Sequence, residues 1–204
     1  MQKDIFLESE GNAWLERNRD KLGQSDPVSK IIEDARLPAP TSILEVGCAN
    51  GWRLANLRDK YDCEVTGVEP SLRACIEAAE LKVPVIHGTA SMLPFAPEKF
   101  DLIIFGFCLY LTDWSDWFRI VAEADTVLRA GGHIIIHDFN NRDEHFARKY
   151  EHHAGVLSHH YRFGVLWLSH PNYSQTWWTW DNDGPDGELI EVIQKGLLDM
   201  RMKP

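Results

Sequence analysis

The clearest chemical pattern in the sequence joins a glycine-rich loop to a carboxylate. Gly47 and Gly51 enclose three small residues directly after a short apolar run. Glycine adopts left-handed backbone conformations without strain, so such a loop can turn sharply and let a ligand approach the main chain. Glu69 follows Gly47 by 22 residues, and a carboxylate about 20 residues beyond such a loop can accept hydrogen bonds from both hydroxyls of a ribose. The two features together favour a nucleoside ligand over a tight turn with no ligand.

The same loop argues against a dinucleotide. The dinucleotide fingerprint G-x-G-x-x-G places its glycines where this sequence has Gly47, Ala49 and Trp52. The third glycine lets a helix pack closely on a strand, and tryptophan is the residue least suited to that position. A nucleoside without a pyrophosphate makes no such demand, so a nicotinamide-dependent oxidoreductase is disfavoured.

His137 and Asp138 close the apolar run at residues 133–138 and carry groups that can move a proton. In a doubly wound sheet, ligands bind outside the carboxyl ends of the strands, which puts both side chains at the rim of the expected site. Either one can serve as the general base for an oxygen nucleophile. Two structural alternatives remain open, because Asp138 can cap the segment that follows and His137 can be a buried histidine with satisfied polar atoms.

Five histidines crowd the next segment and raise the question of a metal site. They include two pairs spaced seven residues apart, about 10 Å along a helix, so neither pair can share an ion if the segment is helical. Gly155 can interrupt such a helix, which leaves the question open. We expect no metal site, and instead a polar wall for a substrate or a plain surface. The five are His145, His152, His153, His159 and His160.

Short apolar runs alternate with amphipathic stretches from residue 41 onward. Apolar strands that alternate with helices indicate a parallel sheet covered by helices on both faces. Ser71 can cap the second helix, and Gly131 with Gly132 is expected to end the third. The expected strands are residues 42–47, 64–69, 83–87, 100–107 and 133–138, and the expected helices are residues 51–60, 71–80 and 114–129.

The two ends of the chain flank this core. Residues 1–40 show a broken helical stripe and then a second helix, 28–37, with Pro27 at its start. Residues 173–180 and 188–194 surround a turn-rich stretch, 182–187, and predict an antiparallel hairpin on the sheet edge. The predicted fold is one α/β domain: a doubly wound, mostly parallel seven-stranded sheet with helices on both faces, a helical N-terminal extension at 1–40, a cofactor-binding core at 41–139 and a substrate lid at 140–173.

Composition narrows the range of partners. The 204 residues carry a formal net charge of −10, which argues against a nucleic-acid partner because its phosphates would be repelled. No apolar run reaches the roughly 18 residues that cross a bilayer, and the first residues lack the apolar core of a signal peptide. We therefore expect a cytoplasmic protein with no membrane contact. The four cysteines form no C-x-x-C pair, so neither a zinc ribbon nor a redox pair is indicated, and the sequence does not fix an oligomeric state.

Five segments, in order, resemble the motifs of the Rossmann-like, or class I, S-adenosylmethionine-dependent methyltransferases. Each motif alone is weakly specific, but five in the family's order make a specific pattern that covers about half of the chain, residues 41–139. Ala49 replaces the middle glycine of the first motif, which is a mild departure. The segments are ILEVGCANG, VEPS, HGTASMLPF, FDLIIFGFCLYL and EADTVLRAGGHIIIHDF.

The resemblance implies S-adenosyl-L-methionine as the cofactor and assigns it a site. The backbone of residues 47–51 would support the methionine part, Glu69 the ribose, and Thr89 with its neighbours the edge of the adenine. Gly106 and Phe107 would lie beside the sulfonium. Thr89 stands where the family usually has an aspartate, and a hydroxyl accepts a hydrogen bond more weakly than a carboxylate. The full implied set is Arg17, Glu45, Gly47, Cys48, Ala49, Asn50, Gly51, Glu69, Pro70, Ser71, Thr89, Ala90, Ser91, Gly106 and Phe107.

These features predict a methyltransferase that acts on a small-molecule acceptor, with O-methylation of a sugar-like or other hydroxylated metabolite as the finer hypothesis. The stretch EGNAWLERN, residues 10–18, resembles the leader of a bacterial subgroup suspected to act on sugars of cell-surface polysaccharides. Within it, Arg17 can clamp the carboxylate of the cofactor or be a solvated helix charge. The alternative function is a non-catalytic module that binds the nucleoside.

Overall fold

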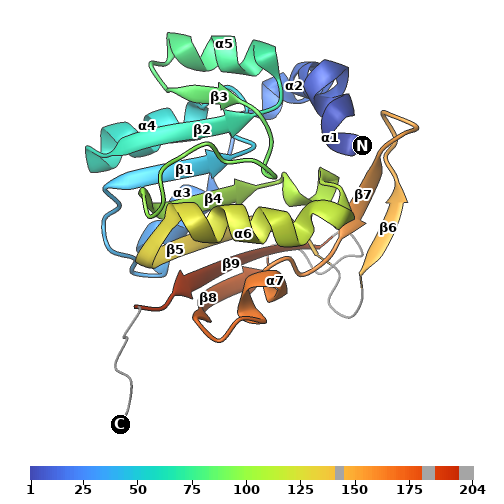
Figure 1. The fold of residues 1–204 in the computed structure, drawn as a ribbon. Coiled ribbons are helices and arrows are strands. Elements are labelled where there is room, and N and C mark those ends of the chain that lie inside the picture. The colour runs from blue at the N-terminus through green and yellow to red at the C-terminus, as the bar shows by residue number, and fades with distance from the viewer. Residues whose placement is uncertain (141–144, 181–186, 198–204) are drawn as a thin grey trace.

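Seven strands form one sheet in the order β3-β2-β1-β4-β5-β9-β8 (Figure 1). The computed structural model describes residues 1–140, 145–180 and 187–197. The five strands from β3 to β5 are mutually parallel, and β9 pairs antiparallel with both β5 and β8. This arrangement confirms the predicted doubly wound sheet and its closing hairpin. The strands are β1 (Ser42–Val46), β2 (Glu64–Glu69), β3 (Val85–His87), β4 (Phe100–Gly106), β5 (Leu128–Phe139), β8 (Tyr173–Trp180) and β9 (Glu188–Lys195).

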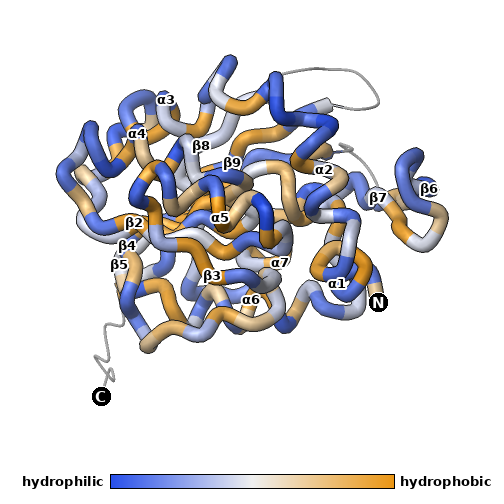
Figure 2. The backbone as a smooth tube through the Cα atoms, turned by 90° about the horizontal axis from the view of Figure 1, so that it is seen from above, coloured by the Kyte–Doolittle hydropathy of each residue, from blue (hydrophilic) through white to orange (hydrophobic). Residues whose placement is uncertain are grey.

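The central strands are apolar on both sides because the sheet is covered on both faces. In β4, Ile103 and Phe105 belong to one core cluster, and Leu102 with Ile104 belongs to the other. One face is covered by α6 (Trp117–Val127) and α7 (Val165–Leu168), and the opposite face by α3 (Pro27–Asp34), α4 (Trp52–Tyr61) and α5 (Leu72–Glu80). Figure 2 shows hydrophobic segments in the interior and hydrophilic ones at the outer turns. Over the described residues, every helix falls short of the length or hydropathy that a membrane crossing requires.

Two helix starts follow from residues that the sequence offers as caps. The side chain of Asp26 accepts a hydrogen bond from the amide of Ser29 at 3.1 Å, with Pro27 in the first position of α3. The Ser71 hydroxyl accepts one from the amide of Ala74 at 3.1 Å and so caps α5. Both helices therefore begin where the sequence predicts, although α3 ends earlier than expected, at Asp34.

The expected helix at 114–129 is shorter than predicted, and its glycine stop signal has a different role. The helix α6 ends at Val127 and β5 begins at Leu128, which pairs with Phe100. Gly131 and Gly132 lie inside β5, where the register between β4 and β5 shifts. A Cβ atom on Gly132 would lie 2.9 Å from the backbone oxygen of Arg129, so the position needs glycine for close packing rather than to end a helix.

The histidine-rich segment forms a small hairpin instead of a helix. Its strands, β6 (Phe146–Lys149) and β7 (Leu157–His160), pair antiparallel in a sheet of their own. The seven-residue spacing of the histidines excluded a shared ion only if the segment were helical. The segment is a hairpin, so that argument does not apply. Of the turn expected at 182–187, residues 182–186 lie outside the described part of the chain.

The N-terminal extension is helical, as predicted, and covers the carboxyl edge of the sheet. It contains α1 (Gln2–Ile5), a π-helical turn (Phe6–Glu10) and α2 (Gly11–Asn18). The side-chain nitrogen of Gln2 donates a hydrogen bond to the carbonyl of Leu111 at 2.9 Å, and its side-chain oxygen accepts one from the backbone amide of Leu157 at 2.7 Å. Gly11 lies so close to the loop after β2 that a Cβ would be 3.0 Å from the nitrogen of Ser71. In Figure 1 the arrowheads of β2 and β3 point towards α2.

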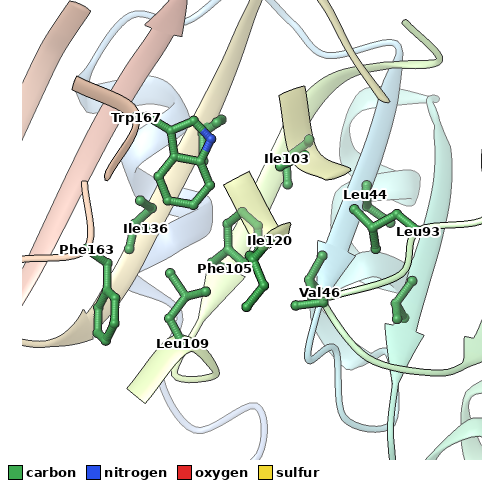
Figure 3. Packing of buried hydrophobic residues seen from close by; sticks show 14 of the residues in the cluster. Leu44, Val46, Leu93, Ile103, Phe105, Leu109, Ile120, Ile136, Phe163 and Trp167 are labelled. Carbon is green, nitrogen blue, oxygen red and sulfur yellow. The ribbon is translucent and has the colours of Figure 1, made fainter. Parts of the chain in front are cut away.

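We expect Trp167→Ala to lower the free energy of unfolding by about 3–5 kcal/mol, because it removes the largest fully buried side chain and leaves a cavity. Trp167 docks α7 on the sheet, with its ring centroid 5.5 Å from that of Phe105 (Figure 3). Trp178→Ala is the matched control, since that side chain is 54% exposed, and we expect it to cost less than about 1 kcal/mol. Equilibrium urea unfolding measures both values, and equal losses would contradict the packing described.

Candidate functional site

A cleft of about 770 Å³, a volume that includes space open to solvent, lies at the carboxyl ends of the strands. Its floor comes from the ends of β1, β2 and β4, its roof from the N-terminal extension, and most of its wall is apolar. The wall consists of Lys3, Phe6, Gly11, Trp14, Val46, Gly47, Val68, Glu69, Pro70, Gly88, Thr89, Ala90, Ser91, Phe107, Cys108, Leu111, Thr112, Asp113, Asp116 and Ile120.

Glu69 is the buried carboxylate of this wall. One of its oxygens accepts a hydrogen bond from the amide of Ala49 at 2.9 Å, and the other accepts from the amide of Ser71 at 2.8 Å. Burial raises the pKa of the Glu69 carboxyl to about 7, although the two amides oppose that rise. Each oxygen keeps a second lone pair, so the carboxylate can hold two loops and still accept hydrogen bonds from a ligand.

The glycine loop turns through a series of left-handed residues. Gly47 and Gly51 have φ angles of +73° and +74°. A Cβ on Gly47 would lie 2.6 Å from Cys108 Cβ, so only glycine fits between the loops after β1 and β4. Ala49 also lies in the left-handed region, with φ +49°, a conformation that costs an L-residue roughly 1–2 kcal/mol. This strain explains why the first motif of the resembling family usually has glycine at this position. The turn also orients the backbone amide of Ala49 so that it donates to Glu69.

The sequence-predicted cofactor residues divide into those that line the cleft and those that do not. The lining residues are Gly47, Glu69, Pro70, Thr89, Ala90, Ser91 and Phe107. Thr89 Oγ1 lies 3.2 Å from the hydroxyl of Ser91, so the two side chains form a pair in this wall. The others are absent from the wall, namely Arg17, Glu45, Cys48, Ala49, Asn50, Gly51, Ser71 and Gly106.

Glu45 and Gly106 lie on the side of the sheet that faces α3 and α4. The Glu45 carboxylate pairs with the guanidinium of Arg53, which also donates to Asp26 at 2.9 Å. Burial raises the pKa of Glu45, and the charge of Arg53 opposes that rise. A Cβ on Gly106 would lie 3.0 Å from Arg53 Nη1. This buried ion network supports the glycine loop from behind, through the first turn of α4.

Arg17 forms contacts within the N-terminal extension and with the hairpin loop. Its guanidinium pairs with the buried carboxylate of Glu10 and donates to the hydroxyl of Tyr150 at 3.1 Å. The role as a carboxylate clamp stays a prediction.

Asp138 and His137, the two candidate bases, have different surroundings. Asp138 is buried and accepts hydrogen bonds from the amides of Leu109 at 2.8 Å and Phe139 at 2.9 Å. Burial raises its pKa to about 7 against those amides. It therefore holds the short helical turn that precedes α6 in the chain, rather than capping the segment after β5. His137 places Nε2 3.0 Å from a carboxylate oxygen of Glu188, and its Nδ1 is buried without a hydrogen-bond partner.

Several wall residues carried no local signal in the sequence. Lys3, Phe6 and Trp14 reach the cleft only because the N-terminal extension folds back over the sheet edge. Lys3 Nζ lies 2.8 Å from a carboxylate oxygen of Asp116, and Asp113 accepts hydrogen bonds from the backbone amides of Gln2 and Lys3. These contacts fasten the roof to the loop after β4, and they depend on pairing between distant parts of the chain.

The histidine group is spread over the hairpin and its flanks. His145 Nε2 lies 3.1 Å from His159 Nδ1, against the indole ring of Trp117. Burial lowers the pKa of His159 to about 4, and the neighbouring His145 adds to the effect. Among residues 1–140, 145–180 and 187–197, no three metal-binding side chains group around a common point. The absence of a metal site in the whole chain stays a prediction.

Comparison with known proteins connects the cleft to a family. Residues 44–136 match the family model described as a methyltransferase domain. The chain is 28% identical over 134 residues to an uncharacterised protein of Haemophilus influenzae, with 62% of this chain and 53% of that protein covered. It is 29% identical over 114 residues to a demethylmenaquinone methyltransferase of Staphylococcus aureus, with 52% and 46% covered. The chain thus spans about half the length of the curated relatives it matches.

A solved structure shares nearly the whole fold. The 1,6-didemethyltoxoflavin-N1-methyltransferase of Burkholderia thailandensis, solved with S-adenosylhomocysteine and 1,6-didemethyltoxoflavin, superposes with a TM-score of 0.76. The match covers 95% of this chain and 88% of that one at 19% identity. At this identity the likeness concerns the fold, and it extends over the N-terminal roof and the C-terminal hairpin.

We expect the free energy of unfolding of the unsubstituted protein to fall, relative to that of the Glu69→Gln variant, as pH rises from about 5 to about 8. The folded-state pKa of Glu69 is raised to about 7 from an ordinary 4.5. Its stabilising contribution is therefore complete below pH 4.5 and is lost as pH rises through 7, whereas glutamine stays neutral. Urea unfolding at several pH values measures the difference. Glu64→Gln, at the exposed start of β2, is the control, and parallel curves for Glu69→Gln would contradict the buried carboxylate.

Proposed function

We propose that this chain, whose residues 44–136 match the methyltransferase-domain family model, is a class I S-adenosylmethionine-dependent methyltransferase that transfers a methyl group from S-adenosyl-L-methionine to a small molecule. The observation that carries the cofactor assignment is the buried carboxylate of Glu69, held between two loops at the end of β2 and facing the cleft. The finer proposal is transfer to a hydroxyl of a sugar-like or otherwise hydroxylated metabolite. We further propose a cytoplasmic enzyme that binds no nucleic acid, given the net charge of −10.

The residues of the cleft fit this cofactor. Each oxygen of Glu69 has a lone pair left for a ribose hydroxyl. Ala90, Leu111 and Ile120 supply an apolar slot suited to a flat adenine ring. The left-handed turn at Gly47 brings main chain, rather than a side chain, to the cleft. When bound, the cofactor supplies a methyl group already activated by the positive charge on its sulfur.

The chain's own part in the reaction is to align the reactants and keep water out. The roof formed by Phe6 and Trp14 encloses the cleft from the side of the N-terminal extension, and exclusion of water strengthens the electrostatic interactions inside. Alignment of an acceptor oxygen with the methyl group lowers the barrier by several kcal/mol. Removal of the hydroxyl proton by a base adds about 10²–10⁴-fold.

The wall composition supports an acceptor with a flat or apolar face. Phe6, Trp14 and Phe107 present aromatic rings to the cleft, and such rings stack on planar groups and on the apolar faces of sugars. The printed names of the demethylmenaquinone and toxoflavin enzymes also give small-molecule acceptors.

A screen with radiolabelled methyl donor tests the proposal. Purified protein is incubated with S-adenosyl-L-[methyl-¹⁴C]methionine and a panel of sugars, nucleotide sugars and hydroxylated metabolites, and label in the acceptor fraction is counted. Transfer to a hydroxylated acceptor supports the finer proposal, and transfer to nitrogen or carbon supports only the coarser one. Tight binding of S-adenosylhomocysteine with no transfer across the panel would favour a non-catalytic nucleoside-binding module.

We expect S-adenosylhomocysteine to bind and to raise the melting temperature with the logarithm of its concentration once that exceeds the dissociation constant, and we expect Glu69→Ala to weaken the binding. The loss should be about 1.5–3 kcal/mol, the range for hydrogen bonds to a charged group. Isothermal titration calorimetry measures it, and Glu64→Ala, at the other end of β2, serves as the matched control. Binding of NAD in place of S-adenosylhomocysteine, or an unchanged dissociation constant in Glu69→Ala, would contradict the assignment.

A further inference from the structure

The imidazole of His137 is buried and held by a carboxylate on one side only. Its Nε2 lies 3.0 Å from Oε2 of Glu188, across the pairing of β5 with β9. The side chain is 3% exposed, and Nδ1 has no hydrogen-bond partner. Because an ionised carboxylate only accepts hydrogen bonds, the neutral form of a ring paired with it in this way has its proton on Nε2 and a lone pair on Nδ1.

This ring lies one side chain away from the cleft. His137 pairs with Gly106 in the register between β4 and β5, and its ring centroid is 4.3 Å from that of Phe107. Phe107 lines the cleft and has φ +51°. A left-handed backbone costs a bulky residue roughly 1–3 kcal/mol and is concentrated at functional sites. His137 is absent from the cleft wall, so an acceptor reaches Nδ1 only when the Phe107 ring moves aside.

Asp138, the other acid at this strand end, is already engaged. Its carboxylate oxygens accept hydrogen bonds from the backbone amides of Leu109 and Phe139. A proton on Asp138 would weaken it as an acceptor for these amides. His137 differs in that its Nδ1 has no hydrogen-bond partner at all.

We infer that His137 is the general base of the proposed methyl transfer and that Glu188 is its positioning residue; the inference rests on the proposed function. Glu188 holds the ring in the Nε2–H form and leaves Nδ1 as the proton acceptor. As the acceptor oxygen forms its bond to the methyl carbon, the carbon–sulfur bond breaks and its electron pair stays on sulfur. The hydroxyl proton moves to Nδ1, and Glu188 stabilises the imidazolium that results.

Nitrogen chemical shifts test the positioning role without any acceptor. In protein labelled with ¹⁵N-histidine, long-range ¹H–¹⁵N spectra distinguish a protonated ring nitrogen from one with a lone pair, and loss of signals in His137→Gln identifies the residue. We expect protonated Nε2 and bare Nδ1, with the preference lost in Glu188→Ala and restored in Glu188→Asp. A protonated Nδ1, or an unchanged spectrum in Glu188→Ala, would overturn the positioning role. S-adenosylhomocysteine should bind all three Glu188 forms equally, because Glu188 lies outside the cleft wall.

Turnover with the acceptor found by the radiolabel screen tests the base. We expect His137→Ala to lower kcat by about 10²–10⁴-fold and Glu188→Ala by roughly 10–100-fold, the loss typical for a group that orients a histidine. KM for the cofactor should stay the same, and Glu188→Asp should recover part of kcat. Glu80→Ala, on the exposed end of α5, is the control. Normal turnover in His137→Ala overturns the inference, whereas an Nε2–H ring with no turnover on any acceptor counts against the proposed function itself.

Discussion

One buried carboxylate fixes the spacing of the two loops on which the cofactor cleft depends. Glu69 accepts an amide from each loop, at Ala49 and at Ser71, and burial raises its pKa to about 7. Because a buried charge without partners is costly, neither loop can move away without exposing the carboxylate to that cost. The register of β1 with β2, which pairs Val46 with Val68, brings the loops within its reach. These two loops of the cleft are thus held in place by the fold itself.

Asp138 fixes the other side of the cleft by the same means. From the end of β5 it accepts the amide of Leu109 and so holds the turn that carries Leu111 into the wall. Glu45 acts from behind the loop after β1, through its pair with Arg53. The strands β1, β2 and β5 thus each carry, at or near the carboxyl end, a buried acid that binds loop amides or a helix cation. All three acids hold the structure together, and of the three only Glu69 lines the cleft.

The sequence predicted what depends on local pattern. The apolar strands, the Ser71 cap, the glycine loop and the acid at Glu69 are each encoded within a few residues, and the structure has them where they were expected. Glu45 was assigned to the cofactor, yet strand alternation already put it on the face opposite Leu44 and Val46. The boundary between α6 and β5 was predicted wrongly because a glycine such as Gly131 permits a left-handed residue either at a helix end or at an irregularity in a strand, and here it lies in the strand.

What the sequence did not predict depends on tertiary pairing. The roles of Asp138 and Glu188 exist only because β5 lies between β4 and β9, which no local spacing encodes. The roof of the cleft is the extreme case, since Gln2 bonds to Leu111 and Leu157, 109 and 155 residues away. A contact between residues so far apart in the chain costs more loop-closure entropy than a contact between neighbours. We therefore expect the roof to be among the last parts of the protein to assemble, so that the ligand site is completed only after the sheet and the hairpin that hold the roof are in place.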